Sequence, residues 1–131
     1  MRALQARLAA HGVSFGHWTF LRILWERDGL TQRELSAEAG VMEPTTVAAL
    51  RAMEKIGYVT RSQVERNRKN VYVHLTPKGR ALKAKLVPLA IEVNEIGLAG
   101  VSAADRAATQ RTLLAIIDNL REHARATLKE R

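Results

Sequence analysis

One stretch of the chain, residues 31–76, constrains the fold more than any other. It reads as a short helix, a tight turn, a second helix and then a basic β-hairpin. Thr31 is followed three residues later by Glu34, a capping-box spacing in which each side chain satisfies an open amide at a helix start. Gly40 can adopt the positive φ that a sharp turn after a helix requires. Pro44 suits the first turn of the next helix, because the N–H that proline lacks has no intrahelical partner there.

The second helix begins near Met42, runs into a strand at Val59 and has two different sides. The residues expected on its buried side are Val47, Leu50, Met53 and Ile56. The residues expected to face outward are Thr45, Thr46, Ala48, Arg51 and Lys55. Small polar residues at the start of a helix permit close approach to a DNA major groove, and an arginine one turn later can read guanine. An amphipathic core helix with a solvated face would show the same pattern, so this helix alone does not separate the two interpretations.

The hairpin that follows carries concentrated positive charge. Apolar and polar residues alternate over residues 71–75, which is typical of a half-buried strand. Val59 belongs to the partner strand, with Arg61 expected to point to solvent, and residues 66–70 are expected to form the loop between the strands. Residues 43–83 contain nine Lys and Arg against three Glu, so +6 of the chain's net charge of +8 lies there. A solvated loop is the alternative, but this concentration favours a polyanion such as DNA.

Three motifs, in this order and spacing, resemble the MarR family of bacterial transcription regulators. They are Leu30-Thr31-Gln32-Arg33-Glu34-Leu35-Ser36, Gly57-Tyr58-Val59-Thr60-Arg61 and Leu75-Thr76-Pro77-Lys78-Gly79. The resemblance covers nearly the whole chain. It implies a mainly α-helical fold with a small β-hairpin wing, in which a winged helix-turn-helix DNA-binding lobe is joined to a helical dimerisation region. Wings of the family usually carry Asp-x-Arg at their tip, whereas this chain has Asn67 and Lys69 there, so the ion pair that fixes the wing is absent.

The resemblance also implies partners and sites. It implies a homodimer that places recognition helices in the major groove of a pseudo-palindromic duplex and wings in the flanking minor groove. The expected DNA-binding residues are Thr45, Thr46, Ala48, Arg51, Lys55, Arg61, Arg66, Arg68 and Lys69, with Arg68 or Lys69 entering the minor groove. It further implies repression relieved by a small ligand, commonly an aromatic acid. The residues expected to line the ligand crevice are His11, Phe15, His17 and Trp18, and core packing is the alternative for Trp18 and Trp25.

Helices are predicted at both ends of the chain. Residues 1–11 form the first, which is shorter than in related chains, so part of a dimer contact is expected to be short. A second helix begins at Pro77, with a kink expected at Pro88 and an apolar stripe at Leu82, Leu86, Leu89, Val93 and Ile96. A last helix follows the capping-box-like Ser102-Ala-Ala-Asp105 and carries an apolar seam of Leu113, Ile116 or Ile117, Leu120, Ala124 and Leu128. A small lobe cannot cover so long a seam, which favours a second copy; a hairpin of the last two helices is the alternative.

We therefore expect one domain over residues 1–131. Residues 1–12 and 77–131 are assigned to the helical dimerisation region, and residues 16–76 to the winged helix-turn-helix lobe. A chain of 131 residues with 47% apolar content can bury a core of its own. It has no cysteine, which excludes disulfides and thiol redox chemistry. No run approaches ~18 apolar residues and no signal peptide is visible, so we expect a cytoplasmic protein without a membrane span.

Catalytic motifs are missing from the sequence. The four histidines show no metal-ligand spacing, the serines lie in no G-x-S-x-G frame, and no phosphate-binding G-x-x-x-x-G-K-[ST] occurs. We therefore expect no enzyme, no cofactor and no metal site. The functional expectation is a sequence-specific regulator of transcription that binds double-stranded DNA. The alternatives are a nucleic-acid-binding module without sequence preference and a winged helix that serves only protein interaction.

Overall fold

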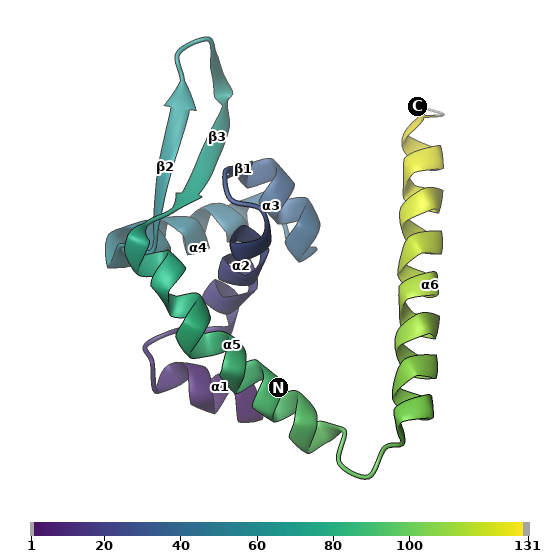
Figure 1. The fold of residues 1–131 in the computed structure, drawn as a ribbon. Helices are drawn as coiled ribbons and strands as arrows, with labels where there is room; N and C mark the ends of the chain where they lie inside the picture. Colours follow the sequence, from purple (N-terminus) through teal and green to yellow (C-terminus); the bar gives the residue numbers. More distant parts are fainter. Residues whose placement is uncertain (1, 130–131) are drawn as a thin grey trace. The chain divides into compact units, whose positions relative to one another are not determined.

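The computed structural model describes residues 2–129, apart from the side chain of Arg68 (Figure 1). Its helices are α1 (Arg2–Ala9), α2 (Phe15–Glu26), α3 (Gln32–Ala39), α4 (Glu43–Ile56), α5 (Pro77–Gly97) and α6 (Ala103–Lys129). Its strands are β1 (Leu30–Thr31), β2 (Val59–Val64) and β3 (Asn67–Leu75). The predicted fold class, mainly helical with a small β-hairpin wing, is confirmed. The chain divides into two compact units, Met1–Val93 and Asn94–Arg131.

Local sequence signals set the boundaries of α3 and α4 as predicted. The hydroxyl of Thr31 accepts a hydrogen bond from the backbone N–H of Glu34, and the Glu34 carboxylate accepts one from the backbone N–H of Thr31, so the capping box is complete. Gly40 ends α3 with a φ of 68°, in the left-handed region. Pro44 lies in the first turn of α4. These signals operate within a few residues, which is why the sequence alone predicts them.

A three-stranded antiparallel sheet with the order β1-β3-β2 forms the wing and its base. Strand β1 was not predicted, because two residues are too few to show an alternating pattern; Leu30 pairs with Val73. The prediction of a loop over residues 66–70 is wrong for residues 67–70, because β3 already begins at Asn67. The register between β2 and β3 shifts between Gln63, which pairs with Val71, and Val64, which pairs with Asn67. The basic end of the wing is therefore an irregular hairpin end rather than a long loop.

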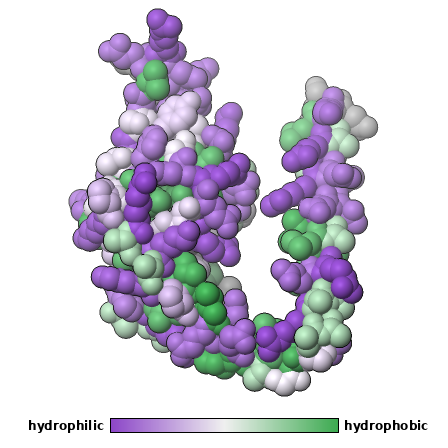
Figure 2. All heavy atoms as spheres, viewed as in Figure 1, coloured by the Kyte–Doolittle hydropathy of each residue, from purple (hydrophilic) through white to green (hydrophobic). Residues whose placement is uncertain are grey.

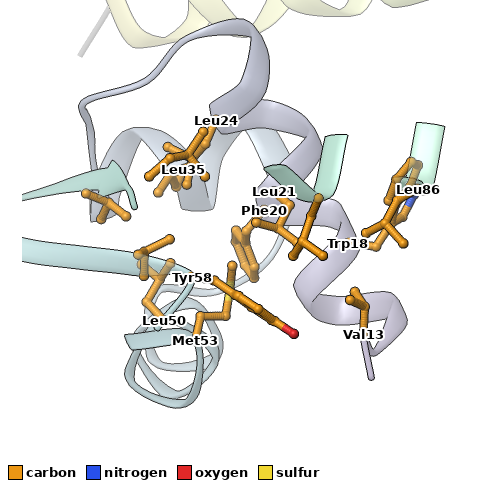
Figure 3. Packing of buried hydrophobic residues seen from close by; sticks show 14 of the residues in the cluster. Val13, Trp18, Phe20, Leu21, Leu24, Leu35, Leu50, Met53, Tyr58 and Leu86 are labelled. Carbon is orange, nitrogen blue, oxygen red and sulfur yellow. The ribbon is translucent and has the colours of Figure 1, made fainter. Parts of the chain in front are cut away.

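The core of the first unit gathers around α2 (Figure 3). Buried apolar side chains from every helix and strand of this unit contribute to it. They are Leu8, Val13, Trp18, Phe20, Leu21, Leu24, Leu30, Leu35, Leu50, Met53, Tyr58, Val59, Val73, Leu75, Leu82 and Leu86. Helix α1 and the beginning of α5 thus share one core with the winged helix-turn-helix segment, which gives α3, α4 and the wing a rigid support.

Polar contacts fix the start of α5 against α2 and the wing base. Asp28 accepts a hydrogen bond from the backbone N–H of Leu75 at 2.8 Å and pairs with Arg80 at 2.9 Å. The indole N–H of Trp25 donates to the carbonyl oxygen of Gly79 at 3.0 Å. The sequence identifies none of these partners, because each joins residues about 50 positions apart.

Of the two glycines in α5, Gly79 has no room for a side chain, whereas Gly97 does. A Cβ at this position would collide with the backbone carbonyl oxygen of Tyr58. We expect Gly79→Ala to lower the free energy of unfolding by roughly 2 kcal/mol or more, because backbone must move to relieve such overpacking. Chemical denaturation would measure the loss. Gly97→Ala is the matched control in the same helix, since nothing lies within 4 Å of a Cβ there, and equal stability of the two variants would refute the assignment.

The second unit comprises the end of α5, a short connection and α6. Arg106 closes the connection, as its guanidinium donates to the carbonyl oxygens of Leu98 at 2.9 Å and Val101 at 3.2 Å and pairs with Glu95 at 3.4 Å. The predicted cap at Ser102 is confirmed, because its hydroxyl accepts a hydrogen bond from the backbone N–H of Asp105. Helix α6 has 27 residues, none of them buried.

Large apolar side chains are exposed along α6 (Figure 2). They are Leu113, Leu114, Ile116, Ile117, Leu120 and Leu128. Within the second unit, residues 94–129, these side chains are therefore left uncovered, and they include most of the predicted seam. On α5, Leu82 and Leu86 of the predicted stripe are buried, whereas Ile96 is exposed. Within residues 2–129, no helix is both long and apolar enough to cross a membrane.

Candidate nucleic-acid interface

The turn between α3 and α4 is held by a buried hydrogen bond. The hydroxyl of Ser36 donates to Oγ1 of Thr46 at 2.7 Å, and both side chains are buried. The prediction that Thr46 faces outward is therefore wrong: it lies on the inner side of α4, where its hydroxyl sets the spacing of the two helices. Thr46 was predicted to face outward because it is small and polar, but a small polar residue can lie on either side of a helix.

The outer face of α4 otherwise carries the predicted residues. Thr45, Ala48, Arg51 and Lys55 are all exposed. On the inner side Leu50 and Met53 are buried as predicted, and Val47 is half-buried. The prediction that Ile56 is buried is wrong, since 40% of it is exposed at the last turn of the helix. The short side chains near the start of α4 permit close approach to a groove of DNA. The two basic residues that follow can contact its bases or phosphates.

The wing presents positive charge at its far end. Glu65 and Arg66 form the turn between the strands, and Arg66 and Lys69 are exposed. The predicted role of Arg68 depends on a side chain that lies outside the described part of the structure. Its backbone belongs to β3, in the segment where the register with β2 shifts. Exposed cations on a thin two-stranded element are suited to reach a DNA backbone or enter a minor groove.

Arg61 differs from the other predicted DNA-binding residues. The expectation that it points to solvent is wrong, because its side chain is only 21% exposed. Its guanidinium pairs with the Glu54 carboxylate at 3.3 Å and donates to the side-chain oxygen of Gln32 at 3.2 Å. The sequence could not show this arrangement, since Gln32 and Arg61 meet only after the sheet has formed.

A hollow of about 230 Å³ lies between the wing and the starts of α3 and α4. Its lining is mostly polar and comprises Thr31, Gln32, Arg33, Glu43, Asn67, Lys69, Asn70 and Val71. Arg33 pairs with Glu43 across 3.4 Å and remains exposed. Gln32, Arg33 and Asn70 were not among the residues predicted to bind DNA. The only signal that could have found them is the helix-turn-helix pattern itself, because it brings the start of α3 toward the wing.

The four residues predicted for a ligand crevice have different environments. Trp18 is buried in the core and packs edge-to-face on Trp25 with ring centroids 5.7 Å apart, so packing accounts for both indoles. Phe15 and His17 are half-buried and His11 is exposed. Desolvation by burial lowers the pKa of His17, so its imidazole is neutral over a wider pH range than a solvated one. A ligand-binding role of these residues stays a prediction.

Known proteins resemble this chain in sequence. A model of the MarR family matches residues 13–71. The HTH-type transcriptional regulator TtmR of Methylorubrum extorquens is 32% identical over 125 residues, which cover 95% of this chain and 62% of TtmR. The chain thus spans less than two thirds of the length of that relative.

Solved structures agree with this relationship. A MarR transcriptional regulator from Methanosarcina mazei superposes with a TM-score of 0.85 at 26% identity, over 92% of this chain and 87% of the other. A protein from Listeria monocytogenes, complexed with a 26mer DNA, shares the fold with a TM-score of 0.82 at 22% identity, over 93% and 84% of the two chains. The family match, these relatives and the winged helix-turn-helix show that the chain belongs to the MarR family of transcriptional regulators.

Proposed function

We propose that the protein is a dimeric, sequence-specific regulator that binds double-stranded DNA in the cytoplasm and represses transcription until a small ligand releases it. The observation that carries the DNA-binding part is the exposed outer face of α4 together with the cationic end of the wing. Thr45, Ala48, Arg51 and Lys55 supply the major-groove contacts. Arg66, Arg68 and Lys69 supply the contacts to phosphates and the minor groove.

Charge and shape support this assignment. The hollow beside α3 is lined by the wing cation Lys69, by Arg33 paired with Glu43, and by Asn67 and Asn70 as neutral hydrogen-bonding groups. Such a surface can accept a phosphate backbone between the recognition helix and the wing. The Listeria protein, which is complexed with a 26mer DNA, has the same fold, and this supports the proposal that the fold binds a duplex.

The proposal of a dimer is supported by the exposed seam of α6. Stable interfaces between copies are more apolar than the rest of a protein surface, and a seam of leucine and isoleucine side chains fits that composition. We assign α1, α5 and α6 to the dimerisation region. Two-fold symmetry would set the two recognition helices about 34 Å apart, the length of one DNA turn, and so require a pseudo-palindromic site.

A ligand could act on the spacing of the two recognition helices. The DNA fixes the spacing at which both helices reach their grooves. A ligand that binds better to a dimer with a different spacing therefore weakens DNA binding by the ratio of its two affinities. We propose the crevice residues His11, Phe15, His17 and Trp18 as its site and an aromatic acid as its chemical class.

Selection of bound duplexes from a random pool tests the function. Recovery of one pseudo-palindromic sequence, and weaker recovery in the presence of aromatic acids such as benzoate or salicylate, is the expected result. Equal recovery of all duplexes would favour a module without sequence preference. No binding of any duplex near physiological salt would favour a protein-interaction role.

Arg51→Ala should relax the sequence preference at one base pair of each half-site. Bidentate reading of guanine discriminates against other bases by about 1–3 kcal/mol, and Arg51 is the exposed arginine on the outer face of α4. Repeating the selection with the variant measures the effect. Arg22→Ala, which removes an exposed arginine of α2, serves as the control. An unchanged consensus with Arg51→Ala would exclude base reading by this residue.

A further inference from the structure

Arg61 connects three elements of the proposed DNA-binding surface. It lies in β2 opposite Val73, near the base of the wing. Its backbone N–H donates to one carboxylate oxygen of Glu54 at 3.1 Å, and its guanidinium donates to the other at 3.3 Å. A second guanidinium nitrogen donates to the side-chain oxygen of Gln32 at 3.2 Å. One residue of the wing thus contacts both α4, through Glu54, and the start of α3, through Gln32.

These contacts leave Arg61 poorly suited to bind a phosphate. An arginine binds phosphate best when its planar fork of N–H donors faces the anion. Here one terminal nitrogen is directed at Glu54 and the other at Gln32, and the Nε atom is buried. The positive charge is also matched by an adjacent carboxylate. Arg66 and Lys69, by contrast, are exposed at the far end of the wing.

We propose that Arg61 is a positioning residue that sets the direction of the wing relative to α4, and that Glu54 is its essential acceptor. This inference rests on the proposed DNA-binding function. Both oxygens of Glu54 accept hydrogen bonds from the same residue of β2, which restrains rotation as well as distance. Because the cations of the wing lie several residues beyond Arg61, a small rotation at the base displaces them from the phosphates. Holding the wing in its binding direction before the encounter lowers the entropy lost on binding.

Glu54→Gln separates a positioning role from a phosphate contact. The substitution removes the negative partner and leaves Arg61 in place. If Arg61 positions the wing, we expect DNA binding roughly five- to tenfold weaker, the size of effect seen when one member of a coupled network is removed. If Arg61 were a phosphate ligand restrained by Glu54, the freed cation would bind DNA more tightly and steepen the salt dependence. Glu65→Gln, the same chemical change at the exposed turn of the wing, is the matched control, and we expect it to tighten binding slightly by removing a charge that repels DNA.

Arg61→Gln and the double variant complete the test. Loss of a phosphate contact in each protomer would lower the slope of log K against log salt by about 1.8 for a dimer, whereas loss of a positioning contact leaves the slope unchanged. We also expect the double variant to bind no more weakly than either single variant, because both remove the same link. Circular dichroism and thermal unfolding establish that each variant is folded. Should Arg61→Gln fail to fold, the comparison of Glu54→Gln with Glu65→Gln decides by itself.

The duplex recovered by selection with the unaltered protein serves as the probe. If the unaltered protein prefers no duplex, the proposed function is refuted and the inference with it. If it selects a duplex but Glu54→Gln binds more tightly than the unaltered protein, or Arg61→Gln lowers the salt slope, only the positioning role is refuted. Weaker binding of Glu54→Gln with an unchanged slope of log K against log salt supports both the proposed function and the positioning role.

Discussion

Replacing Leu113 and Leu120 with glutamate should convert the protein from a dimer into a monomer and abolish its preference for a pseudo-palindromic duplex. Both side chains are exposed in the single chain and lie seven residues apart on α6, on one face of the helix. Two-fold symmetry applies each substitution twice. Since burial of a leucine contributes about 1.5–3 kcal/mol, loss of four should weaken the dimer by at least about 6 kcal/mol, even before any cost of burying carboxylates.

The mass in solution and the affinity for the selected duplex measure the two effects. Ala115→Glu with Asn119→Glu is the matched control, because it adds the same charge to exposed positions of α6 away from Leu113 and Leu120. We expect this control to remain a dimer. A Leu113→Glu/Leu120→Glu variant that stays dimeric and keeps its preference would show that α6 does not join the two copies. A monomeric variant that keeps its preference for the pseudo-palindromic duplex would instead show that dimerisation is not required for sequence-specific binding.

The parts of the fold that the sequence predicts are those set by neighbouring residues. The capping box of Thr31 and Glu34, the left-handed Gly40 and the early Pro44 each act within one turn of a helix, and all three were confirmed. Apolar spacing likewise predicted the buried positions of Leu50 and Met53. These features need no knowledge of the rest of the chain.

Two of the errors arise where a distant partner decides the orientation of a side chain. Thr46 fits an outer polar face by composition, but Ser36 on the preceding helix draws it inside. The position of Arg61 in strand β2 predicted a solvent-facing side chain. Its guanidinium instead donates hydrogen bonds to Glu54 of α4 and Gln32 of α3. Both residues belong to the predicted DNA-binding set. In the sequence, a polar residue that faces solvent cannot be distinguished from one that is hydrogen-bonded to another element.

Replacing Arg68 and Lys69 with alanine should weaken binding to the selected duplex about a thousandfold near ~0.1 M salt, if both residues of each wing neutralise phosphates. A dimer would lose four cationic contacts, and each contact contributes about 0.9 to the slope of log K against log salt. The slope should therefore fall by about 3.6. Because phosphate contacts carry no sequence information, the consensus recovered by selection should stay the same while every affinity falls.

Lys83→Ala with Lys85→Ala provides the comparison that separates wing contacts from net charge. It removes the same two charges from exposed positions of α5, outside the proposed interface. If long-range attraction by the overall charge of +8 were sufficient, both double variants would lose affinity and slope equally, because the net charge is the same. If the wing instead lies against the backbone of the duplex, only the Arg68/Lys69 variant should lose most of its slope, since release of condensed counterions requires direct neutralisation of phosphates. An unchanged slope in that variant would mean that the wing does not contact DNA and would leave α4 as the principal contact.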